Sequence, residues 1–290
     1  MTDSDYQVLL YYKYIHIDDP VKLMQQQRLL CQKLGLKGRI LIASEGLNGT
    51  LEGIKEKTEE YCKQLQKNPQ FSDIQFKKSI GTGMAFPKLK VKVRDEIVAT
   101  HLGKDDLDST QVTGKYLMAE QLHEWIKSKK EFYIVDMRND YEQKSGYFEG
   151  SLLSGFDEFR DLPQILPKLN PLKGKTIVTV CTGGVRCEKA SGFLVKNGFL
   201  DVYQLYGGIV TYMEKYPNQD FKGKLYVFDN RLVMGFNTDA PEHEIIGRCL
   251  LCNSASDNYV NCTNNLCHLH FICCTNCLDE KGNAYCKGCL

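Results

Sequence analysis

Residues 176–190 read TIVTVCTGGVRCEKA, an apolar run that ends at a cysteine, followed by a loop with two glycines and the start of a helix. The β-branched run is typical of a buried strand in a parallel sheet. The glycines let the loop turn tightly and direct its N–H groups inward, and the helix adds the positive end of its dipole. These groups, with Arg186, favour a thiolate at Cys181. The segment therefore predicts a nucleophilic cysteine, with a small buried side chain as the alternative.

Three flanking motifs surround this segment: FYIVDMR at residues 132–138, GYFEGS at 146–151 and GFLDVYQLYGGI at 198–209. With the cysteine loop they resemble the rhodanese domain, in which a strand ends in the catalytic cysteine and the next loop cradles a persulfide. The resemblance implies an α/β domain with a parallel sheet over residues 113–236, including a C-terminal extension. It also implies an active-site loop of Thr182, Gly183, Gly184 and Val185, and Tyr147 stands where the family usually has histidine.

Residues 1–98 alternate strand-like and helix-like segments in the order βαββαβ, with one more strand at the end. The expected strands are residues 6–15, 37–43, 48–52, 74–78 and 88–93, and the expected helices are 20–34 and 55–67. This order predicts a ferredoxin-like α+β domain, similar to acylphosphatase, with an appended strand. A polar, acidic connector over residues 99–112 is expected to join it to the next domain.

Basic residues repeat at every second position near the end of this domain. Lys88, Lys90, Lys92 and Arg94 alternate with apolar residues, so a strand places all four on one face. Lys37 and Arg39, on another expected strand, are predicted to extend the same surface. Such a row suits RNA phosphates, and a merely solvated sheet face is the alternative.

The C-terminal part, residues 237–290, concentrates cysteine. Of 13 cysteines in the chain, nine lie between Cys249 and Cys289. Eight of them form four spaced pairs and are the predicted metal ligands: Cys249, Cys252, Cys262, Cys267, Cys274, Cys277, Cys286 and Cys289. Eight thiolates suit two structural zinc ions, without which so short a segment holds no fold. The pairing stays open, as do replacement of a ligand by Cys273, His268 or His270 and a disulfide-linked knot.

The whole-chain composition excludes few functions. The chain has 290 residues and a net charge of +1, so overall charge predicts no partner. The first residues lack a basic segment followed by an apolar one, and no apolar run reaches membrane-spanning length. A cytoplasmic protein with no membrane partner is expected.

Four further segments extend the resemblance to a specific family. They are LKGRILIASEGLNGT at 36–50, FPKLKVKVRDEIV at 86–98, the loop CTGGVRCEKA with its second cysteine Cys187, and KLYVFDNR at 224–231. Together they resemble the bacterial tRNA uridine hydroxylase family, in which such an N-terminal domain is joined to a rhodanese domain and a cysteine-rich tail. The resemblance implies oxygen-dependent conversion of the wobble uridine to 5-hydroxyuridine. It also implies tRNA, through its anticodon region, as partner and molecular oxygen as co-substrate.

The residues suggest a cysteine-based mechanism. No flavin, haem or iron motif is evident, so no organic cofactor is predicted. Cys181 is the predicted catalytic residue, reacting through a persulfide or a sulfenic acid, and Arg186 is expected to stabilise its charge. Cys187 is expected to act as a resolving thiol, with a packed small residue as the alternative. Two other functions stay open: a sulfurtransferase that takes sulfur from a donor protein or small molecule onto Cys181, and a non-catalytic RNA-binding scaffold.

Overall fold

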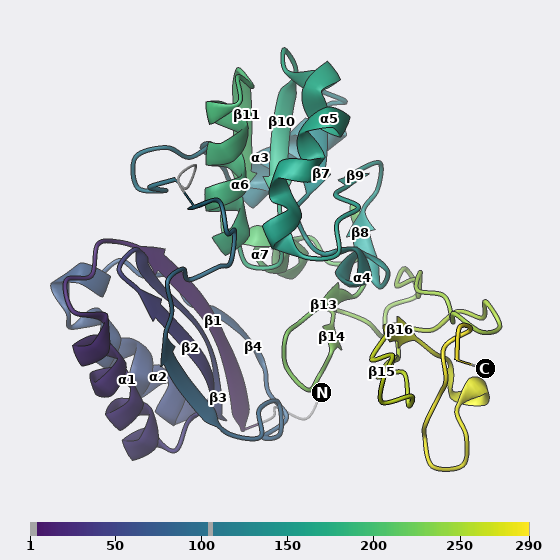
Figure 1. Ribbon diagram of the computed structural model, residues 1–290, viewed down its shortest axis with the longest axis horizontal. Helices are drawn as coiled ribbons and strands as arrows, with labels where there is room; N and C mark the ends of the chain where they lie inside the picture. The colour runs from purple at the N-terminus through teal and green to yellow at the C-terminus, as the bar shows by residue number, and fades with distance from the viewer. Residues whose placement is uncertain (1–4, 104–106, 290) are drawn as a thin grey trace.

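The computed structural model describes residues 5–103 and 107–289, and it divides into an N-terminal domain, a central domain and a tail (Figure 1). We use these names for residues 1–98, 113–236 and 237–290. Residues 104–106 of the expected connector lie outside the described residues. Within the described part, no helix is both long and apolar enough to cross a membrane.

The N-terminal domain is a five-stranded sheet with two helices on one face (Figure 1). Its elements are β1 (Tyr6–Tyr14), α1 (Pro20–Leu34), β2 (Lys37–Ala43), β3 (Gly46–Ile54), α2 (Lys55–Gln66), β4 (Lys77–Ile80) and β5 (Leu89–Val93). The strand order β4-β1-β3-β2-β5, with β5 parallel to β2 and the other pairs antiparallel, confirms the ferredoxin-like arrangement and its appended strand. Strand β4 starts later than predicted, because Ile74 is buried in the core after a short 3-10 turn.

The two faces of this sheet differ in what they contact. Side chains alternate along a strand, so Leu9 and Tyr11 of β1 enter the core beneath the helices. Leu10 and Tyr12 point to the other face, which carries no helix of this domain and faces the central domain (Figure 1). The N-terminal domain therefore presents one sheet face as a wall toward its neighbour.

The central domain has a five-stranded, entirely parallel sheet in the order β6-β11-β10-β7-β9. Its elements are β6 (Lys115–Leu117), α3 (Ala119–Lys127), β7 (Tyr133–Asp136), α4 (Asp140–Gln143), β8 (Gly146–Phe148), β9 (Leu152–Leu153), α5 (Leu166–Leu169), β10 (Thr176–Val180), α6 (Val185–Lys196), β11 (Asp201–Leu205) and α7 (Gly208–Lys215). Strand β10 lies in the middle with Ile177, Val178 and Val180 fully buried, as its apolar sequence predicts. The predicted α/β domain with a parallel sheet is confirmed.

Two short sheets complete the central domain. Strand β12 (Phe221–Gly223) pairs with β8, and β13 (Leu225–Tyr226) pairs with β14 (Val233–Met234). The loop between β13 and β14 reaches the N-terminal domain, where Asn230 N–H donates to Ala85 O at 2.9 Å and Arg231 donates to Ile80 O at 2.8 Å. The tail contains one hairpin, β15 (Tyr259–Asn261) with β16 (His270–Ile272).

Candidate active site and metal centres

The cysteine loop connects the central strand β10 to helix α6. It turns at Gly184, whose φ of 100° lies in the left-handed region that glycine tolerates best. The loop rests on the start of α7: Ile209 N–H donates to Cys181 O at 2.9 Å and Val210 N–H donates to Thr182 O at 3.1 Å. A Cβ on Gly208 would lie 2.6 Å from the Gly183 carbonyl carbon, so only glycine permits this approach. The second glycine of LYGGI therefore supports the loop.

The two loop thiols occupy one buried site but differ in ionisation. Burial alone would raise the pKa of Cys181, but the Cys187 side chain, the Arg186 charge and the N–H groups of Cys187 and Gly184 lower it to about 6. The Gly184 nitrogen lies 3.3 Å from the Cys181 sulfur. Burial and the neighbouring Cys181 thiolate raise the pKa of Cys187 well above its usual value. At neutral pH, Cys181 is a thiolate and Cys187 a protonated donor beside it.

A buried carboxylate fixes the arginine beside this thiolate. Arg186 makes two bonds to Glu142, Nη1 to Oε1 at 2.5 Å and Nη2 to Oε2 at 2.8 Å, and a third to the Thr182 hydroxyl at 3.3 Å. Glu142 is fully buried and also accepts the Asn139 N–H at 2.9 Å. The bidentate pair holds the guanidinium rigidly, so its charge acts on Cys181 from a fixed position.

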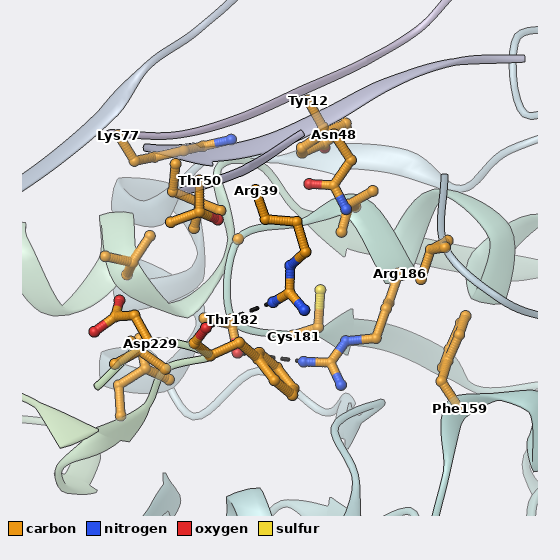
Figure 2. A pocket seen from close by; sticks show the side chains of 18 of the residues that line it. Tyr12, Arg39, Asn48, Thr50, Lys77, Phe159, Cys181, Thr182, Arg186 and Asp229 are labelled. Atoms are coloured by element: carbon orange, nitrogen blue, oxygen red, sulfur yellow. Dashed lines mark hydrogen bonds between the residues drawn. The ribbon is translucent and has the colours of Figure 1, made fainter. Parts of the chain in front are cut away.

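A cavity of about 670 Å³ lies beside the cysteine loop and is lined by both domains. Its lining includes Leu10, Tyr12, Arg39, Asn48 and Lys77 from the sheet, Cys181, Thr182 and Arg186 from the loop, and Phe228 and Asp229 from the β13–β14 connection. Figure 2 shows the Cys181 sulfur pointing from the loop toward the sheet side. Most of the exposed lining surface is apolar, and charged and polar side chains from both domains also reach it.

The N-terminal domain packs directly on the loop. A Cβ on Gly183 would lie 2.6 Å from Leu10 Cδ2, and one on Gly184 would lie 2.8 Å from the Tyr12 hydroxyl oxygen. The Tyr12 hydroxyl in turn donates to Glu188 of α6 at 3.0 Å. The absence of side chains at Gly183 and Gly184 thus allows the N-terminal sheet to approach the loop closely, and glycine at 184 also permits the turn.

The predicted basic residues are all exposed: Lys37, Arg39, Lys88, Lys90, Lys92 and Arg94. Strands β2 and β5 pair in parallel with Arg39 opposite Lys90, so these two side chains share a face. Arg39 also lines the cavity and donates to Phe228 O at 3.5 Å. The basic row therefore begins at the cavity and continues along the open face.

Two residues of the site were not predicted from the sequence. Glu142 stands next to the GYFEGS motif without a signal of its own, although a carboxylate three residues after Asn139 fits a helix-capping pattern. Lys77 was assigned to a strand that started three residues too early and received no role. Only the packing of the two domains brings it to the cavity.

The tail brings its eight predicted ligands together in two groups of four. One group is Cys249, Cys252, Cys274 and Cys277, and the other is Cys262, Cys267, Cys286 and Cys289, with all sulfurs of a group within 4.8 Å of one another. Zn–S bonds of about 2.3 Å hold tetrahedral sulfurs roughly 3.8 Å apart. The Cys252–Cys274 and Cys267–Cys286 sulfur distances of 3.5 and 3.6 Å fit this geometry.

The grouping resolves the pairing that the sequence left open. The first pair combines with the third and the second with the fourth, so the two sites interleave along the chain. Cys273 and the two histidines belong to neither group within the described residues, and His270 instead contacts Asn261 at 2.8 Å and the Tyr226 hydroxyl at 3.1 Å. Four thiolates leave no open coordination position, which suits structural ions.

Comparison with known proteins gives matches over almost the whole chain. Family models described as UPF0176 acylphosphatase like domain, Rhodanese-like domain and Rhodanase C-terminal match residues 6–97, 118–215 and 222–290. A solved rhodanese-like domain protein from Staphylococcus aureus is 29% identical, with a TM-score of 0.30, and covers 34% of this chain and 90% of that one.

Two curated relatives align over nearly their full length. The tRNA uridine(34) hydroxylase of Bacillus licheniformis is 43% identical over 289 residues, covering 99% of this chain and 87% of that protein. The tRNA uridine(34) hydroxylase of Cytophaga hutchinsonii is 42% identical over 286 residues, covering 99% and 90%. This chain belongs to the tRNA uridine(34) hydroxylase family.

Proposed function

We propose that this protein hydroxylates C5 of the wobble uridine of tRNA, with Cys181 as the reactive group and molecular oxygen as co-substrate. The curated relatives carry the name of this activity. The observation that supports it most is the Cys181 thiolate in the wall of a cavity large enough for a nucleotide. Enzymes that modify a base extrude it into such a pocket.

The basic row binds the anticodon arm. Lys37, Arg39, Lys88, Lys90, Lys92 and Arg94 contact its phosphates, which brings the wobble position to the mouth of the cavity. Arg39 belongs both to the row and to the cavity lining. An RNA backbone bound along the row therefore reaches the cavity that Cys181 lines. These contacts provide affinity without reading the sequence of the RNA.

The loop residues have separate roles in this reaction. Arg186, fixed by Glu142, keeps Cys181 anionic before it reacts. Cys187, held protonated beside it, is the resolving thiol for an oxidised form of Cys181. Two zinc ions hold the tail together and take no part in the chemistry, and the enzyme acts on tRNA in the cytoplasm.

Reconstitution with purified components tests this function. The wild-type protein, incubated with unmodified tRNA in air, should yield 5-hydroxyuridine at position 34, and in the absence of oxygen it should not. Cys181→Ser should lose the activity while its tRNA affinity stays within about twofold of the wild type, since the basic row is unchanged. Hydroxylation by Cys181→Ser at the wild-type rate refutes the assignment.

The second candidate is a sulfurtransferase, favoured by the loop amides that surround the Cys181 sulfur and suit a persulfide. Turnover with thiosulfate and cyanide tests it. A high rate that tRNA does not change favours sulfur transfer, and a low rate together with tRNA hydroxylation favours the proposed function.

A further inference from the structure

The cavity contains a lysine, Lys77, that has no role in the reaction proposed above. Lys77 lies on β4 opposite Leu10 of β1, so it shares the open sheet face with that cavity residue. Its ammonium lies 4.6 Å from the centre of the Tyr12 ring. Across residues 5–103 and 107–289, no carboxylate forms a salt bridge with it. In Figure 2 its side chain extends along the sheet side of the cavity.

The adjacent lysine shows what an ordinary cation of this strand does. Lys78 points to the helix side of the sheet and forms a salt bridge with Glu59 of α2 at 2.6 Å. Lys77 instead faces the Tyr12 ring and the cavity, where the negative charges of Cys181 and Glu188 act on it. The two neighbouring lysines therefore differ in what they face: Lys78 faces a carboxylate of α2, and Lys77 faces the cavity.

The charges around Lys77 come from both domains. Burial lowers the pKa of Lys77 to about 8, while the negative charges of Cys181 and Glu188 act in the opposite direction. Tyr12 on β1 lies beneath it with its hydroxyl bonded to Glu188. On the other cavity walls, Arg39 is exposed and Asp229 is paired with Arg231. A lysine of this kind is able to give and regain a proton near neutral pH.

We propose that Lys77 is a catalytic residue that binds O4 of the uracil ring while the Cys181 thiolate adds to C6; this role rests on the proposed function. Lys77 lines the cavity from the sheet and Cys181 lines it from the loop, and the proposal places the base between them. Lys77 thus supplies the acid that binds O4, and Cys181 supplies the nucleophile.

The step balances without an oxidant. The thiolate electron pair forms the S–C6 bond, the C5–C6 π bond breaks, and its electron pair spreads over C5, C4 and O4 as an enolate. The Lys77 ammonium donates a hydrogen bond or its proton to O4, where the charge accumulates. C5 becomes the electron-rich carbon that the subsequent oxidation requires, and reversal of the addition restores uridine and thiolate.

Because the addition needs no oxygen, it is measurable alone. In deuterium oxide under anaerobic conditions, the wild-type protein should exchange the C5 hydrogen of the wobble uridine for deuterium, which mass spectrometry detects. Lys77→Met should slow both this exchange and aerobic hydroxylation about 100-fold, the lower range for acid–base groups. The control Lys57→Met, on the exposed side of α2, should match the wild type in both assays.

The pH profile and a conservative variant separate catalysis from folding. Exchange by the wild type should rise as Cys181 ionises near pH 6 and fall as Lys77 loses its proton near pH 8. Lys77→Arg, which keeps a cation at high pH, should retain part of the rate without the fall above pH 8. The inference is overturned if Lys77→Met exchanges hydrogen at the wild-type rate. It is also overturned if the exchange rate of Lys77→Arg still falls above pH 8, or if the wild type hydroxylates tRNA but does not exchange the C5 hydrogen. Absence of hydroxylation by the wild type itself instead contradicts the proposed function.

Discussion

At the scale of single residues, the site depends on an unequal pair of thiols. Cys187 donates to Cys181 and lowers its pKa, while its own pKa rises. Both residues are fully buried, so neither ionisation is governed by bulk water. The sequence places two cysteines six positions apart, but only the loop geometry shows which one is the thiolate.

Replacing the donor thiol should therefore weaken the nucleophile. Cys187→Ala removes a hydrogen bond to the Cys181 sulfur, so the pKa of Cys181 should rise from about 6 and its alkylation at pH 6.5 should slow severalfold. Cys187→Ser keeps an O–H donor at the same place and should stay closer to the wild type. The measurement is iodoacetamide labelling against pH, read by mass spectrometry on the peptide that contains Cys181. Identical profiles for the alanine variant and the wild type support the reading of Cys187 as a packed small residue.

At the scale of elements, helix α7 supports the cysteine loop through a glycine contact. Gly208→Ala forces its Cβ against the Gly183 carbonyl carbon at 2.6 Å, so the free energy of unfolding should fall by about 3 kcal/mol, the upper range for ordinary substitutions. The control is Gly198→Ala, which has a similar positive φ but nothing within 4 Å, and should lose only about 1 kcal/mol. Urea denaturation measures both, and equal losses contradict the supporting role of the contact.

The basic row makes a prediction about strands β2 and β5. Lys90→Ala and Lys92→Ala should each weaken tRNA binding similarly for all tRNA sequences, and each lost phosphate contact should reduce the slope of log affinity against log salt by about 1. Lys57→Ala on α2 keeps the row intact and provides the control. Binding assays at several salt concentrations measure this slope. If the slope is unchanged in both variants, the basic row is a solvated face that does not contact the RNA.

How much of this was predictable differs from element to element. Local sequence patterns mark strand β10, the cysteine loop and the flanking motifs. The structure confirms the parallel sheet that these patterns predict. Strand β4 was misplaced because Ile74, which looks like a strand residue, packs into the core from a turn. The roles of Lys77 and Glu142 depend on contacts across 44 or more residues of chain or between domains, which no local pattern encodes.

At the scale of the whole molecule, two domains that differ in fold build one site. The N-terminal sheet supplies one wall of the cavity, the central domain supplies the thiolate, and the β13–β14 connection ties both together. The tail packs on the central domain, where the Tyr259 hydroxyl donates to Tyr141 O at 2.5 Å. The site therefore exists only when the domains are docked.

The interleaved metal sites lead to a prediction for the tail. The wild-type protein should contain two zinc ions, and Cys252→Ser or Cys274→Ser should each remove the same one, so that the double variant still retains one ion. Cys267→Ser and Cys286→Ser should likewise share the other. Cys273→Ala, outside both groups, should keep two ions. Metal analysis of the purified variants checks this, and loss of one ion from each single variant but of both ions from the Cys252/Cys274 double variant contradicts the grouping.

The most direct test of the central claim, that the Cys181 thiolate modifies the wobble uridine, is mass spectrometry of tRNA nucleosides from cells that lack this protein. The account predicts that 5-hydroxyuridine and its derivatives at position 34 decrease in these cells. It also predicts that the wild-type gene restores them and Cys181→Ser does not. Full restoration by Cys181→Ser, expressed at the same level, contradicts the account.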